Sequence, residues 1–191
     1  MSLEITDLEH DPFRGEHYDR GGLMIWGFSH HKGDEEKDHS GFTQQTVEEL
    51  ALTGSNWFFN RIRKYFGNED PCVFWNRVAF ANTLPTTVPS EFRYSSGSKE
   101  QIGRTKGRIR RILTCLAPRR VVLFSAKGWE HWPKLNGSVP EPALQLMSEP
   151  NLWHGTYEFG VGHEIKVYNL PHPQYQPDEK MIERVKHLLN H

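Results

Sequence analysis

The sequence predicts an α/β protein built on a sheet of parallel strands. Three short runs, at residues 23–26, 78–82 and 121–125, have the length of strands. The first is apolar without alternation, which is typical of a strand covered by helices on both faces. An amphipathic stretch over 99–116 is followed by Pro118 and then by the third run. A helix, a proline and a buried strand in succession indicate an α/β unit.

The composition is that of one globular domain, which we expect to span residues 1–191. Residues 1–20 are polar, and we expect an extended, partly flexible arm that lies over the site. The net charge of −1 gives no overall attraction to nucleic acid, although eight Lys or Arg lie between positions 99 and 120. Cys72 and Cys115 form no C-x-x-C pair. With no targeting signal and no long apolar run, we expect a soluble, cytoplasmic monomer that does not enter a membrane.

The first half of the chain is expected to contain a long loop and two helices. The loop at residues 29–41 carries three histidines, and loops of this length are often functional. Thr43 is a candidate cap for the first helix and Ser55 for the second, which would end at Gly67. The second helix repeats apolar residues at helical spacing, which we expect in the core: Trp57, Phe58, Ile62, Tyr65 and Phe66.

The second half alternates helices and strands. Phe74 and Trp75 favour a short helix just before the strand at 78–82. Five further elements are expected: helices at 128–132 and 140–147, strands at 157–159 and 164–168, and a closing helix capped by Asp178. The G-x-G between the last two strands lacks the strand-then-helix context of a dinucleotide-binding loop.

Polar side chains stand at the ends of three predicted strands. The first strand is followed by Ser29 and His30, the second ends in Asn82, and His172 follows the last. In open parallel sheets, ligands bind beyond the carboxyl ends of the strands, so we expect the site here. Taken alone, His172 before a proline favours a turn residue hydrogen-bonded to backbone, and Asn82 is also consistent with a side chain that caps a turn.

Four segments follow one another in a recognisable order. They are Leu23-Met-Ile-Trp-Gly27, Val78-Ala-Phe-Ala-Asn82, Val121-Val-Leu-Phe-Ser125 and Asn169-Leu-Pro-His172-Pro173-Gln174. This order resembles the uracil-DNA glycosylase superfamily, in a divergent branch, over about residues 21–189. The resemblance rests on order and context rather than on one long motif. It implies a three-layer α/β/α sandwich with a mainly parallel four-stranded sheet.

The resemblance also implies a DNA N-glycosylase that flips out and excises an aberrant or modified base, in repair or in antiviral defence. Asn82 would hydrogen-bond the Watson–Crick edge of the base, because an amide presents a donor and an acceptor in one plane. His172 would donate to the base oxygen on which charge develops. Phe28 or Phe42 would stack on the base.

Contacts with DNA are expected from four further residues. Gln174 and Tyr175 would fill the gap left by the flipped nucleotide. The basic face of residues 99–116 adds Arg104 and Arg108, although a charged outer face is ordinary on a solvated helix. The proposed partner is DNA, either single- or double-stranded, and the reaction requires no organic cofactor and no metal.

The loop after the first strand departs from the pattern of the family. Many members place a carboxylate just after the first glycine to position water, whereas Ser29 stands near that place here. A hydroxyl orients water but is no base at neutral pH. His30 or His31 would supply the base, or Asp34 or Glu35 would do so from the loop. A base other than uracil is therefore equally compatible with the sequence.

Two other functions remain open on the sequence. A protein that kept the fold and lost catalysis would bind nucleic acid, and the missing carboxylate favours this alternative. A metal-dependent hydrolase would use the histidines and carboxylates of residues 30–39. No H-x-H or H-E-x-x-H pattern supports the metal site.

Overall fold

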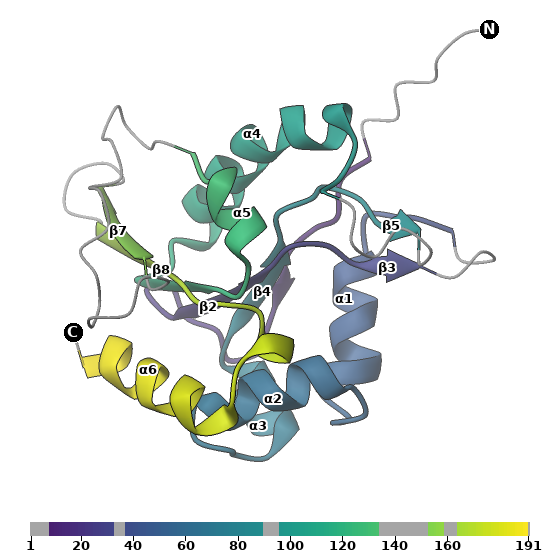
Figure 1. The fold of residues 1–191 in the computed structure, drawn as a ribbon. Helices are drawn as coiled ribbons and strands as arrows, with labels where there is room; N and C mark the ends of the chain where they lie inside the picture. Colours follow the sequence, from purple (N-terminus) through teal and green to yellow (C-terminus); the bar gives the residue numbers. More distant parts are fainter. Residues whose placement is uncertain (1–7, 33–36, 90–95, 134–152, 159–163, 191) are drawn as a thin grey trace, which may run out of the picture.

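A six-stranded sheet with four parallel inner strands forms the centre of the protein (Figure 1). It is seen in a computed structural model that describes residues 8–32, 37–89, 96–133, 153–158 and 164–190. From one edge to the other, the strands are β1 (Phe13–Arg14), β4 (Ala79–Asn82), β2 (Leu23–Gly27), β6 (Arg120–Leu123), β8 (Glu164–Asn169) and β7 (Trp153–Glu158). The outer strands β1 and β7 pair antiparallel with their neighbours. The predicted α/β class is confirmed, whereas the expected strand number of four is wrong because these two edge strands extend the sheet.

The register of the inner strands brings their carboxyl ends to one edge. Gly27, the last residue of β2, lies opposite Asn82, the last residue of β4. On its other side β2 pairs with β6, and β6 pairs in turn with β8, where Leu123 lies opposite Asn169. The loops that follow β2, β4, β6 and β8 therefore leave the sheet on the same side.

Helices cover both faces of the sheet (Figure 1). One face carries α4 (Lys99–Leu116) and α5 (Ala126–Glu130). The opposite face carries α1 (Phe42–Thr46), which continues into a π-helical turn (Val47–Ala51), and also α2 (Trp57–Tyr65), α3 (Pro71–Asn76) and α6 (Asp178–Asn190). A small pair of strands, β3 (His31–Lys32) and β5 (Val88–Pro89), joins two of the loops, and a 3₁₀ turn, η3 (Pro173–Tyr175), follows β8.

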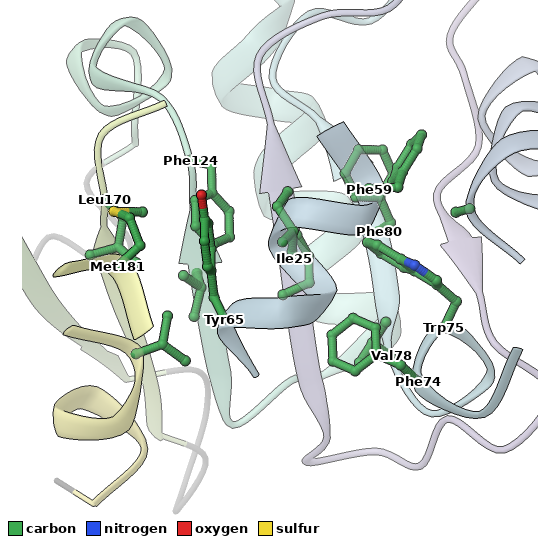
Figure 2. Close-up of a cluster of buried hydrophobic side chains, with 14 of the residues drawn as sticks. Ile25, Phe59, Tyr65, Phe74, Trp75, Val78, Phe80, Phe124, Leu170 and Met181 are labelled. Atoms are coloured by element: carbon green, nitrogen blue, oxygen red, sulfur yellow. The ribbon is translucent and has the colours of Figure 1, made fainter. Parts of the chain in front are cut away.

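Alternation along the strands divides the core between the two faces. In β2, Ile25 packs in the cluster under α2 and α3, while Met24 and Trp26 pack in the cluster under α4. Figure 2 shows the first cluster, where Phe59 and Phe80 lie close to Ile25. All five side chains are less than 5% exposed, so both faces of the sheet are buried, as the unbroken apolar run predicts.

The bounds of α4 agree with those predicted, and local capping explains them. Ser98 accepts a hydrogen bond from the Gln101 N–H at 3.1 Å, and the Gln101 side chain accepts one from the Ser98 N–H at 2.8 Å. This reciprocal pair satisfies two amides that a helix start leaves free. The helix ends at Ala117, whose φ of 44° lies in the left-handed region.

Two predicted helix caps are wrong. The first helix begins at Phe42, so Thr43 lies inside it, and its buried hydroxyl is used by His30 instead. The second helix is capped by Asn56, whose side chain accepts from the Phe58 N–H at 2.9 Å. The hydroxyl of Ser55 instead donates to the Glu49 carbonyl, in the preceding helical turn, which also accepts from the Thr53 hydroxyl.

The remaining elements follow the predicted order. The helix α5 and the strands β7 and β8 are present with shifted bounds, and α6 begins at Asp178. The helix expected at 140–147 lies outside the described residues. Among the helices that the structure describes, none is long and apolar enough to cross a membrane.

Candidate functional site

The side chain of Asn82 lies directly against the backbone of Gly27. A Cβ atom added to Gly27 would lie 2.2 Å from the Asn82 Oδ1, so only glycine leaves room for the amide. The next residue, Thr83, fixes the chain there, because its N–H and its hydroxyl both donate to the Gly27 carbonyl at 3.1 Å. Asn82 is 3% exposed, at the edge where the strand ends meet. The amide is therefore packed against the end of β2, where glycine leaves room for it.

The loop after β2 places its histidines in contrasting surroundings. His30 is buried, and its Nε2 lies 3.1 Å from the Thr43 hydroxyl. Burial, together with the charges of His10 and Arg108, lowers the pKa of His30 to about 3. Its imidazole is thus neutral at pH 7 and a poor proton acceptor. Ser29 is half-buried and His31 is exposed.

The two aromatic candidates of this region are both half-buried. Phe28 follows Gly27, and its carbonyl accepts from the Leu84 N–H at 2.9 Å. Phe42 lies beside His30, with ring centroids 5.5 Å apart. A residue of the N-terminal arm, His10, also stacks on Phe42.

No sequence motif indicated a role for His10, in the N-terminal arm. Its imidazole lies nearly parallel to Phe42, with ring centroids 5.2 Å apart and an angle of 14°. Its Nε2 is hydrogen-bonded to the Asp38 carboxylate, which also accepts from the Thr87 N–H at 3.1 Å. His10 is 1% exposed, and its Nδ1 has no hydrogen-bond partner among the described residues.

Asp38 is ionised in this cluster. Burial acts to raise the pKa of its carboxyl, but the hydrogen bonds from His10 and Thr87 and the charge of His10 outweigh burial. The pKa therefore lies below its ordinary value. No sequence signal pointed to these contacts, because the three residues come from separate polar segments.

His172 begins the 3₁₀ turn after β8 and is held by two kinds of contact. Its Nδ1 accepts a hydrogen bond from the Gln174 N–H at 3.2 Å, and its ring stacks on Phe58 at 5.4 Å and 23°. Burial, and to a smaller extent the charge of Arg61, lowers the pKa of His172. A neutral imidazole whose Nδ1 is an acceptor carries its proton on Nε2, so His172 presents an N–H donor.

Exposed aromatic side chains surround His172. Trp57 is 50% exposed and Tyr175 is 64% exposed, and both rings lie within 6.5 Å of the His172 ring. Arg61 lies over Trp57 at 5.2 Å and is fixed by the Asp178 carboxylate at 2.7 Å. The expectation that Trp57 lies in the core is wrong, because it stands at the first turn of α2, beyond the cover of the sheet.

Aromatic contacts connect His172 with the ends of β2 and β4. Phe58, under His172, contacts Phe59, and Phe59 packs on Phe80 of β4 with centroids 5.3 Å apart. Phe80 in turn contacts His30 at 6.0 Å. The N-terminal part of α2 thus bridges the loop after β8 and the loop after β2.

The arginines expected to contact DNA are engaged within the protein. Arg108 is 2% exposed, and its Nε lies 3.5 Å from the Asn82 carbonyl. Burial lowers the pKa of Arg108 to about 10, which leaves it charged at pH 7. Arg104 donates to the Leu8 carbonyl at 2.8 Å and pairs with Glu9 at 3.2 Å. Gln174, also an expected DNA contact, is exposed beside Tyr175.

The described part of the chain contains no group of three His, Cys, Asp or Glu side chains that could hold a metal ion. The metal-dependent hydrolase therefore has no ligand set among these residues. His39 is hydrogen-bonded to Gln45 at 3.1 Å rather than directed toward His30. Asp34 and Glu35, named as alternative bases, lie outside the described residues. Both cysteines are free and exposed.

Comparison with known proteins assigns no family to the chain. No model of a protein family matches it, and no curated protein matches it either.

Proposed function

We propose that the protein is a DNA N-glycosylase of the uracil-DNA glycosylase type. The observation that carries this proposal is the state of His172, a neutral imidazole with its proton on Nε2 at the same edge of the sheet as Asn82. The four parallel strands between two layers of helices support the corresponding three-layer fold.

The reaction is the hydrolysis of the bond between a base and C1′ of its deoxyribose. As this bond breaks, its electron pair leaves with the base, and negative charge develops on a base oxygen. The N–H of His172 would stabilise that oxygen without giving up its proton, since a preplaced neutral donor needs no rearrangement as the charge grows. The Asn82 amide would accept from one atom of the base and donate to its neighbour.

The aromatic residues would hold the nucleotide during this step. Phe42 would stack on the extruded base in the place that His10 occupies, and Phe28 lies in the same loop region. Tyr175, with Gln174 beside it, projects from the turn that begins at His172 and could enter the duplex gap. Trp57, on the other side of His172, would stack on a neighbouring base.

Water must add to the sugar cation to complete the reaction, with one proton released to solvent. The low pKa of His30 makes it unsuitable as the acceptor of that proton. Ser29 would therefore orient the water, and the exposed His31 would accept its proton. His31 passes the proton of water to solvent, the hydroxyl product forms on C1′, and the departed base anion takes up one proton from solvent.

The test is base release from a panel of labelled oligonucleotides that contain uracil, hypoxanthine, alkylated bases or bulky modified cytosines. Wild type is compared with His172→Ala and with His17→Ala. His17 is a matched control because it is exposed at the opposite end of β4, where its N–H donates to the Asn76 carbonyl at 2.8 Å. We expect release from one substrate, slowed about 100-fold to 1000-fold in His172→Ala and unchanged in His17→Ala.

A second function is favoured by one observation, that Ser29 stands near the position after Gly27 where a water-positioning carboxylate would be expected. A nucleic-acid-binding protein of the same fold would need no such group. Binding of the oligonucleotides without release of any base from the panel would support this alternative and overturn the glycosylase.

A further inference from the structure

The N-terminal arm crosses the candidate site and is bonded to it by its backbone. The His10 N–H donates to the Pro85 carbonyl at 2.8 Å, in the loop after β4. The Asp11 N–H donates to the Ser40 carbonyl at 2.7 Å, in the loop after β2. These two bonds hold Glu9 and His10 against the loops that follow β4 and β2.

The carboxylate of Glu9 lies among three arginines of α4. Its oxygens lie 3.2 Å from Arg104 Nη2, 2.5 Å from Arg111 Nη2 and 3.9 Å from Arg108 Nη1. One carboxylate does not satisfy three guanidinium groups, and Nη2 of the 2% exposed Arg108 has no hydrogen-bond partner among the described residues. A tetrahedral phosphate, with more acceptor oxygens, suits this set of donors better than a planar carboxylate does.

One of these arginines, Arg108, adjoins the residue proposed to read the base. The Nε of Arg108 lies 3.5 Å from the Asn82 carbonyl, while its Nη1 faces Glu9. A single guanidinium group therefore separates Glu9 from the end of β4. An anion in the place of Glu9 would lie beside the base-binding region.

The neighbouring residue, His10, has the shape of a small base. Its planar ring lies on Phe42 at 5.2 Å and 14°, and its ring nitrogen is hydrogen-bonded at the edge by Asp38. This is how a protein holds an unstacked base, with one aromatic face and a polar group at the edge. His10 thus occupies the face of Phe42 that a nucleotide would need.

We propose that Glu9 and His10 fill a nucleotide-binding site, with Glu9 in the place of a phosphate on Arg104, Arg108 and Arg111 and His10 in the place of a base on Phe42. A DNA strand must displace this segment to bind. The inference rests on the proposed function for the identity of the ligand as DNA. A hollow of about 540 Å³, bordered by Leu8, Glu9, Asp11, Ser40, Arg104 and Arg111, gives the strand an entry, and its volume is typical of ligand sites.

The first test measures the affinity for a short fluorescein-labelled single-stranded oligodeoxynucleotide by anisotropy. Glu9→Gln removes the competing charge, and we expect binding to tighten about tenfold, because a tethered competitor lowers the fraction of open sites. Asp11→Asn is the matched control, since it removes one negative charge from the same arm and borders the same hollow. Adding Arg111→Ala to Glu9→Gln should reverse the gain.

An equal change in Glu9→Gln and Asp11→Asn would show a general charge effect and overturn the inference. An affinity of Glu9→Gln equal to that of wild type would also overturn it. A second measurement uses wild type alone and is independent of how well the variant folds. Saturating oligonucleotide should accelerate hydrogen exchange at the His10 and Asp11 amides, whose carbonyl partners would be lost, and unchanged protection would refute displacement.

The outcomes separate this inference from the proposed function. Tighter binding by Glu9→Gln with no base released from any substrate would keep the nucleotide site and overturn the glycosylase. Base release with no effect of Glu9→Gln on affinity or turnover would keep the glycosylase and overturn the role of the arm.

Discussion

Lowering the pH from 7 to 5 is expected to destabilise the protein by about 2 kcal/mol through His30 alone. The pKa of His30 falls from 6.5 to about 3 on folding, because the ring is buried beside His10 and Arg108. Between these two pH values, His30 is protonated in the unfolded chain and neutral in the folded chain. The contribution of His30 to the free energy of unfolding is therefore complete above pH 6.5 and is lost as the pH falls. At pH 5 only the unfolded state is protonated, which fixes the loss at about 1.4 kcal/mol for each pH unit below 6.5.

The assay is urea unfolding of wild type and of His30→Gln at pH 7 and at pH 5. Glutamine has no titration in this range and can keep a hydrogen bond to Thr43. The free energy of unfolding of wild type should fall by about 2 kcal/mol more than that of the variant. An equal fall in both proteins would mean that His30 accepts a proton freely in the folded state, and the described burial would be wrong.

Other titrating groups do not obscure this comparison. The pKa of Asp38 is lowered on folding, so its contribution is present above its ordinary value of 3.8 and is lost only as the pH falls below it. The pKa of His172 is also lowered, so its contribution is lost in the same direction as that of His30. Since both residues are present in wild type and in the variant, their contributions cancel in the difference.

Three comparisons, with substitutions at five residues, test local packing and helix capping by urea unfolding. Gly27→Ala places a Cβ 2.2 Å from the Asn82 Oδ1 and should lower the free energy of unfolding by about 1–3 kcal/mol. Adding Asn82→Ala should restore part of this loss, and a fully stable single variant would contradict the close approach. Ser98→Ala breaks the reciprocal cap of α4 and should cost about 1 kcal/mol, and no loss would mean that the cap is redundant. Trp57→Ala, at a 50% exposed residue, should cost less than about 1 kcal/mol, whereas the fully buried Trp75→Ala should cost about 3–5 kcal/mol; similar costs would refute the surface position of Trp57.

The elements that the sequence predicted well depend on neighbouring residues. The helix α4 is bounded by Ser98, Gln101 and Pro118, all of which act within a few positions of its ends. The strand β2 is apolar because helices cover both of its faces, and its end follows from a glycine that the neighbouring amide requires. Such features can be read from a single stretch of sequence.

Predictions failed where distant parts of the chain decide the outcome. Trp57 has the spacing of a core residue, but it lies in the first turn of α2, which extends past the sheet. Periodicity shows which face of a helix is apolar, not how far along the helix the sheet covers that face. Thr43 has the chemistry of a cap, but the burial of His30 gives its hydroxyl another partner. The antiparallel edge strand β1 has only two residues, too few to show a pattern.

The contacts of the arm explain why the surroundings of the basic helix α4 could not be predicted from its own charges. Arg104 and Arg108 were expected on an outer face, open either to water or to DNA. In the fold, Glu9 lies against them although it is about a hundred positions away in the chain, and Arg108 is almost completely buried. The same arginines cannot hold Glu9 and a phosphate at once, so their affinity for DNA is linked to the position of the arm. Under the proposed displacement, the strength of the Glu9 contact would therefore set how readily the protein binds a strand, independently of the groups proposed for base release.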